Sequence, residues 1–136
     1  MNNVDIMRGL YQSFGAGDMP AVLGAMTPDI EWREAEGNPY KPDGEPLVGP
    51  DAIVQNLFIK LGEEWDGFTV TPHSFYDAGD AVIVEARYTG KYKATGHDLN
   101  AQVCHIWKLV DGKAKSFQQY TDTAQFHEAM EYRKAG

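Results

Sequence analysis

The stretch AQVCHIWKL, residues 101–109, is predicted to form a β-strand whose apolar face is interrupted by a histidine. Successive side chains of a strand point to opposite sides of the sheet. One face of this stretch therefore carries Val103, His105, Trp107 and Leu109. Its other face places Cys104 and Ile106 between polar residues, so we expect both faces to be covered. The imidazole must then find a hydrogen-bonding partner or line a cavity.

The composition is typical of one globular domain spanning residues 1–136, with 43% hydrophobic and 24% charged residues. The net charge is −8 without a cluster of Lys and Arg, which argues against nucleic acid as a partner, because phosphates require a basic face. No apolar run approaches the roughly 20 residues that span a bilayer, and no signal peptide is predicted, so we expect no membrane partner. With a single cysteine, no intrachain disulfide is possible, and a cytoplasmic location is expected.

The spacing of apolar residues predicts helices in the first half of the chain and strands in the second. Helices are predicted over 2–14, 19–26 and 49–65, and strands over 30–35, 68–76, 81–93, 101–110 and 114–123. A loop rich in Pro and Gly covers 36–46, and a helical stretch, 124–134, closes the chain. Asn2 or Asn3 is expected to cap the first helix and Asp18 the second, while Pro72 predicts a bulge or an edge strand. The order α-α-β-α-β-β-β-β indicates an α+β fold, with helices on one face of a curved sheet.

Three phrases carry a resemblance to a known family: YQSFGAGDMPAVLGAMTPDIEW (11–32), VGPDAI (48–53) and HIWKLVDGKAKSFQQYTDTA (105–124). In this order they resemble the nuclear transport factor 2-like superfamily, and within it the SnoaL-like and ketosteroid-isomerase-related group. The resemblance implies a cone: a curved, mixed or antiparallel sheet wrapped around three helices, with an apolar pocket. It also implies a homodimer through the outer face of the sheet, which would cover Cys104 and Ile106. The superfamily includes isomerases, cyclases, hydrolases, dehydratases and non-enzymes, so the reaction does not follow from the fold.

The pattern of ketosteroid isomerase, an Asp base with a Tyr and a protonated Asp as oxyanion donors, can be laid over this sequence. Glu34 then falls at the position resembling the base, and His105 at that resembling the protonated Asp. The position of the Tyr falls on Leu10, with Tyr11 one residue away. Steroid isomerisation itself is therefore not indicated.

Glu34 and His105 are the predicted catalytic residues. Glu34 shares its strand face with Trp32, so burial would raise the pKa of its carboxyl into the range suited to proton transfer. The alternative places Glu34 in solvent at a frayed strand end. His105 would contact a ligand carbonyl, or it would be a core histidine bonded to a hydroxyl or to the amide of Gln119. On the ligand-binding hypothesis, His105→Leu keeps the fold and weakens binding.

The remaining predicted substrate-binding residues are mostly aromatic: Trp32, Tyr88, Trp107, Gln119, Phe14, Phe58 and Phe117. Asp122 is interpreted as a strand-end cap, with catalysis as the alternative, and Tyr40 as a surface residue rather than part of a loop over the pocket. Arg87 points away from the pocket by alternation, which argues against an epoxide-hydrolase-like site. The four histidines lack metal-ligand spacing, and there is no nucleotide-binding glycine motif, so no metal and no cofactor are expected.

The sequence therefore predicts a cofactor-independent isomerase or cyclase that acts by proton transfer on a small, apolar carbonyl compound. The alternative is a non-catalytic protein that binds a small molecule in the same cone.

Overall fold

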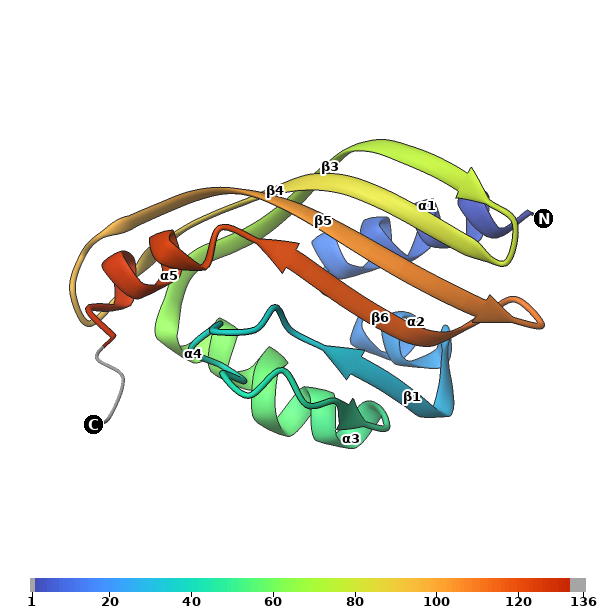
Figure 1. The fold of residues 1–136 in the computed structure, drawn as a ribbon, viewed down its shortest axis with the longest axis horizontal. Helices are drawn as coiled ribbons and strands as arrows, with labels where there is room; N and C mark the ends of the chain where they lie inside the picture. Colours follow the sequence, from blue (N-terminus) through green and yellow to red (C-terminus); the bar gives the residue numbers. More distant parts are fainter. Residues whose placement is uncertain (1, 133–136) are drawn as a thin grey trace.

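A computed structural model describes residues 2–132 and shows an α+β fold in which a bent sheet arches over helices (Figure 1). The helices are α1 (Asn3–Gly15), α2 (Met19–Gly24), α3 (Pro50–Ile53), α4 (Ile59–Glu64) and α5 (Thr123–Met130). The strands are β1 (Met26–Arg33), β2 (Leu47–Val48), β3 (Trp65–Ala78), β4 (Ala81–Tyr92), β5 (Asp98–Val110) and β6 (Lys113–Thr121). None of the helices in this part of the chain is long and apolar enough to cross a membrane.

The sheet is open and mixed, with the strand order β2-β1-β6-β5-β4-β3. The four long strands form the antiparallel meander that the sequence predicts, whereas β1 joins β6 in parallel, with Trp32 opposite Phe117. Pro72 lies on the edge strand β3, where the register with β4 shifts between Pro72 and Ser74. Both the bulge and the edge position are thereby confirmed, because proline has no N–H for the ladder.

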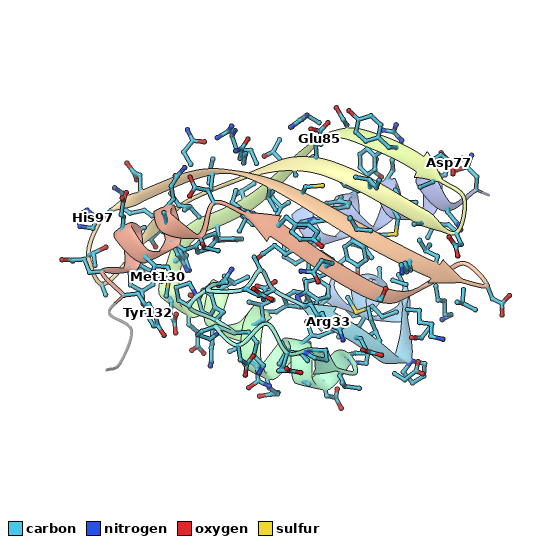
Figure 2. All side chains as sticks on the ribbon, viewed as in Figure 1. Arg33, Asp77, Glu85, His97, Met130 and Tyr132 are labelled. Carbon is cyan, nitrogen blue, oxygen red and sulfur yellow. The ribbon has the colours of Figure 1, made fainter. Side chains whose placement is uncertain are left out.

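Alternation holds along the long strands and directs one face of the sheet toward the helices. In β5 the buried row includes His105, Trp107 and Leu109, as predicted, and in β4 it includes Val84 and Tyr88. Glu85 lies on the opposite side of β4, away from the helices (Figure 2). The buried face of the sheet and the apolar faces of the helices together form the core.

The helix caps follow the predicted residue types. The side chain of Asn2 accepts a hydrogen bond from the Asp5 N–H, and that of Asp18 accepts one from the Ala21 N–H. Each bond satisfies a backbone donor that has no partner within its helix.

Several predicted boundaries are wrong, each because a tertiary contact overrides a local preference. Met26 begins β1 rather than ending the second helix: the Ala114 N–H donates to the Ala25 carbonyl and draws this segment into the sheet. β2 was not predicted, and β3 starts at Trp65, before the glycine expected to precede it.

The third predicted helix and the C-terminal helix also differ from expectation. The helix over 49–65 contains a π-helical segment, Val54–Phe58, between α3 and α4. The C-terminal helix ends at Met130, and the last predicted positions, 133 and 134, lie outside the described residues.

Candidate active site

A cavity of about 50 Å³ lies between the buried face of the sheet and the helices. All nine residues predicted for the site line it: Glu34, His105, Trp32, Tyr88, Trp107, Gln119, Phe14, Phe58 and Phe117. Trp32 stacks on Phe117 with ring centroids 3.7 Å apart and packs edge-on against Trp107 at 5.5 Å. Among the residues 2–132, no Lys or Arg lines the cavity, so an anionic ligand would find no opposite charge there.

A second hollow adjoins the cavity. A hollow along α1, α4 and the start of β3 shares four lining residues with the cavity: Phe14, Phe58, Leu61 and Phe68. Phe14 and Phe58 contact each other edge-on at 5.4 Å. Because benzene occupies a cavity of ~150 Å³ in a protein core, a ring-sized ligand requires these side chains to move. The π-helical segment that carries Phe58 is a type of helix distortion often found at functional sites.

Glu34 follows β1 and is buried among aromatic side chains, with 4% of its surface exposed. The indole N–H of Trp32 donates to its Oε2 at 3.2 Å, whereas Oε1 accepts no hydrogen bond from the described residues. Removal from water raises the pKa of this carboxyl to about 7, although the Trp32 bond opposes the shift. The burial of Glu34 beside Trp32 is as predicted, and a pKa near 7 suits a proton acceptor and donor at neutral pH.

Carboxyl carbon NMR over a pH range should show Glu34 titrating near pH 7, because the charged form is the one that burial disfavours. Glu31, an exposed residue of β1, gives a second carboxyl signal in the same spectrum. A Glu34 pKa at or below the ordinary value of ~4.3 would show that water reaches the carboxylate.

His105 is buried at the centre of the cavity wall and has a partner at each ring nitrogen. Its Nδ1 lies 2.5 Å from the hydroxyl of Tyr11 on α1, and its Nε2 lies 2.7 Å from the hydroxyl of Tyr88 on β4. The indole N–H of Trp107 donates to the Tyr11 hydroxyl at 2.9 Å. Burial lowers the pKa of His105 to about 3, so the ring is neutral at pH 7. The imidazole thus lines the cavity, but two phenols occupy both of its polar atoms.

Gln119 lies opposite His105 in the β5–β6 ladder, yet it reaches His105 only through Tyr88. Its Nε2 donates to the Tyr88 hydroxyl at 2.9 Å. Its Oε1 accepts from the Ala35 N–H at 3.1 Å and from the Asn38 Nδ2 at 2.9 Å. The amide therefore ties the loop that follows Glu34 to the centre of the sheet. The sequence suggested a direct hydrogen bond between His105 and Gln119 as one alternative, and within residues 2–132 this bond is not formed.

Tyr40 was predicted to be a surface residue, and this is wrong. Its ring lines the cavity, and its hydroxyl donates to Glu64 at 2.7 Å while accepting from the Trp65 indole N–H at 2.8 Å. These contacts hold the loop over 36–46 against α4 and β3. Proline and glycine content correctly indicated a loop but carried no information about the surface on which it folds.

Two further predictions concern residues outside the cavity. Asp122 precedes α5 and accepts from the Gln125 side chain at 3.1 Å, but its side chain accepts no hydrogen bond from a backbone N–H of α5, so the predicted cap is not formed. Arg87 is exposed on the outer face and donates to Asn100 at 2.9 Å, so it takes no part in the cavity. Within the described residues, no group of three His, Cys, Asp or Glu side chains is arranged to hold a metal ion.

The sequence analysis missed Tyr11 as a site residue. The resemblance to ketosteroid isomerase placed the oxyanion tyrosine at Leu10, and both residues line the cavity. Adjacent residues of a helix point about 100° apart, so Tyr11 reaches the wall from a different angle. The sequence did contain one signal for this role, namely a tyrosine directly after the aligned position.

Comparison with known proteins agrees with this geometry. The sequence pattern of the SnoaL-like domain matches residues 7–117. The chain belongs to the SnoaL-like domain family. A search of curated proteins gives no match.

Solved structures of the same fold include close and distant relatives of this SnoaL-like domain. An NTF2-like protein from Burkholderia thailandensis is 37% identical, with a TM-score of 0.89 over 96% of this chain and 98% of its own. TerC, co-crystallised with polyporic acid, is 27% identical, with a TM-score of 0.82 over 96% and 98% of the two chains. A protein from Jannaschia sp. CCS1 assigned to the SnoaL-like polyketide cyclases is 19% identical, with a TM-score of 0.81 over 97% and 93%, and supports the fold alone.

Proposed function

We propose that this SnoaL-like domain is a cofactor-independent isomerase or cyclase that moves a proton on a small, largely apolar carbonyl compound. The observation that carries the proposal is a buried carboxyl, Glu34, in the same cavity as the hydroxyl groups around His105. Its pKa is about 7, and one of its oxygens accepts no hydrogen bond from the described residues. A base and hydrogen-bond donors on one apolar cavity are what enolisation requires.

The proposed reaction begins with Glu34 as a carboxylate. It accepts a proton from the carbon next to the carbonyl, while hydrogen-bond donors stabilise the negative charge that develops on the carbonyl oxygen. The same carboxyl then returns the proton to another carbon, which isomerises the substrate. Alternatively, the enolate carbon attacks a second carbonyl of the substrate, which closes a ring, and the alkoxide that forms takes the proton back from Glu34. The aromatic walls bind the apolar remainder of the substrate.

Relatives make an organic ligand reasonable for this cavity. TerC was co-crystallised with polyporic acid, and the fold is shared with proteins assigned to the polyketide cyclases. These names concern those proteins, and the substrate of this chain is proposed from its own cavity.

A non-catalytic binding protein is the second candidate, and one observation favours it. Both nitrogens of His105 and both polar groups of Gln119 are engaged within the protein, which is also what a purely structural network would look like.

Proton exchange distinguishes the two candidates. Cyclohexanone in D₂O should exchange its α-hydrogens for deuterium faster with the protein than with buffer alone, as followed by proton NMR. The exchange should depend on the deprotonated form of Glu34 and therefore increase through pH 7. Binding of cyclohexanone without enhanced exchange would favour the binding protein.

We also propose a homodimer through the outer face of the sheet. Cys104 and Ile106 are only partly buried there, and Tyr120 of the neighbouring strand is 56% exposed. Light scattering at micromolar concentration should give twice the mass of the chain, and Ile106→Lys should give the monomer mass, because a charge would replace an apolar contact. A wild-type monomer would contradict the proposal.

A further inference from the structure

Five side chains form one continuous hydrogen-bonded chain across the cavity wall: Trp107, Tyr11, His105, Tyr88 and Gln119. Both of its ends are fixed donors. The indole N–H of Trp107 can only donate. The amide of Gln119 is oriented by two donors on its Oε1, so its Nε2 faces Tyr88.

Tyr11, His105 and Tyr88 together carry more polar hydrogens than the contacts between them can use. Burial raises the pKa of Tyr11 and of Tyr88 and lowers that of His105, so the three groups are neutral and carry one hydrogen each. Two contacts join them, one at each ring nitrogen of His105. One phenol must therefore accept two hydrogen bonds and keep its own hydrogen for a group outside the chain.

The two distances at His105 favour one of the two phenols. The contact between Tyr11 and Nδ1 is 2.5 Å, below the usual range of about 2.7–3.2 Å for an N–H donor, and it is the shorter of the two contacts, which favours a hydroxyl donor at Nδ1. In this arrangement Tyr11 donates to Nδ1, and the ring hydrogen is on Nε2. Nε2 then donates to Tyr88 at 2.7 Å. The oxygen of Tyr88 accepts hydrogen bonds from both His105 and Gln119. The hydroxyl hydrogen of Tyr88 therefore has no partner among the five hydrogen-bonded side chains.

We propose that the Tyr88 hydroxyl is the hydrogen-bond donor for the ligand and that His105 is a positioning residue, which holds Tyr88 in the donating state by carrying its hydrogen on Nε2. This inference rests on the proposed function and assigns the donor that function requires. Tyr88 and Glu34 line the same cavity, and no hydrogen bond joins them in the described residues. A ligand oxygen bonded to Tyr88 would therefore lie in the cavity that Glu34 also lines.

The assignment also defines the chemistry of the ligand. A hydroxyl hydrogen requires an acceptor, and the cavity offers no Lys or Arg within residues 2–132 to balance a carboxylate or a phosphate. The acceptor is therefore a neutral oxygen, and the carbonyl of a ketone or enone is the one that the proposed function requires. During the reaction the Tyr88 hydrogen stays on its phenol and strengthens its bond as the ligand oxygen becomes negative, so no further proton carrier is needed.

The position of the His105 hydrogen can be tested without a ligand. Long-range proton–nitrogen NMR of the ¹⁵N-labelled protein at pH 7 should show a neutral His105 with its hydrogen on Nε2, assigned by comparison with His105→Gln. A hydrogen on Nδ1 would make Tyr11 the free donor and overturn the proposal. An imidazolium, or a mixture of both neutral forms, would also overturn the assignment of a single donor.

Cyclohexanone and its isostere methylenecyclohexane, which has no oxygen, test the ligand contact. The carbonyl stretch of bound cyclohexanone should move to lower frequency in the wild type and in Tyr11→Phe, but not in Tyr88→Phe. Tyr88→Phe should bind cyclohexanone at least tenfold more weakly than Tyr11→Phe does and methylenecyclohexane equally well. A shift lost in Tyr11→Phe and kept in Tyr88→Phe would overturn the proposal.

The two experiments separate this inference from the function on which it rests. If His105 carries its hydrogen on Nε2 but cyclohexanone does not bind, the carbonyl ligand and the proposed function are both wrong, while the hydrogen count stands. If cyclohexanone binds and exchanges deuterium but its carbonyl stretch is the same in the wild type and in Tyr88→Phe, the function stands and Tyr88 is not its donor.

Discussion

Replacing Glu34 with glutamine is expected to lower protein-catalysed deuterium exchange into cyclohexanone by a factor of about 10²–10⁴, the usual contribution of a general base. Glutamine has nearly the same shape and can still accept the Trp32 hydrogen bond, but it cannot accept a proton. The matched control is Glu31→Gln, an exposed position on β1, the strand that precedes Glu34, and it should leave the exchange rate unchanged. A Glu34→Gln protein with undiminished exchange would remove Glu34 from the reaction.

The same substitution should increase stability at high pH. The pKa of Glu34 is about 7 in the folded protein, above its ordinary value, so the folded state holds this proton more tightly than the unfolded state does. The contribution to stability is present at acidic pH and is lost as the pH rises through 7, by an amount on the order of 3 kcal/mol. Denaturant unfolding should therefore show Glu34→Gln to be more stable than the wild type at pH 8 and similar to it at pH 5. If Glu34→Gln were less stable than the wild type at pH 8, burial would not disfavour the charged Glu34 carboxylate.

His105→Leu is expected to destabilise the protein by about 2–4 kcal/mol, because two buried phenols each lose a hydrogen-bond partner. The sequence alone suggested that leucine would suit this apolar row and keep the fold. The structure changes that expectation, since Tyr11 and Tyr88 are both buried and both bond to the imidazole. His97→Leu, at an exposed turn, is the control and should change the free energy of unfolding by less than about 0.5 kcal/mol.

The stability of the wild type should also respond to acid through His105. The folded pKa is about 3, below the ordinary value, so the unfolded state takes up a proton that the folded state refuses. This contribution is complete above the unfolded pKa of ~6.5 and is lost as the pH falls toward 3. The difference in unfolding free energy between the wild type and His105→Leu should accordingly shrink from pH 7 to pH 4. A constant difference over that range would show that His105 is protonated as readily in the fold as outside it.

Much of the cavity wall could be predicted from alternation alone. Trp107 and Phe117 belong to strands of more than eight residues, in which a single register places every second side chain on the buried face. Alternation also predicted that Gln119 on β6 and Glu34, directly after β1, face the cavity. The family resemblance supplied the cone and indicated that these faces surround a pocket.

Predictions failed where neighbours in space were distant in sequence and no periodic pattern linked them. Tyr40 lies in a loop whose course is decided by Glu64 and Trp65. Met26 has helical spacing with the residues before it, but parallel pairing with β6 overrides that preference. Propensity differences of less than about 1 kcal/mol per residue are easily exceeded by such contacts.

The sequence by itself determined the long strands, the caps of α1 and α2 and which side chains of the long strands face inward, because each of these depends on neighbours within a few positions. Only the tertiary structure decided what the inward side chains do. Tyr11 and His105 are 94 residues apart, and their bond exists because the sheet bends over α1 and brings a helix phenol to a strand imidazole. Burial gives Glu34 its raised pKa and His105 its lowered one, and burial depends on every element that excludes water from the cavity.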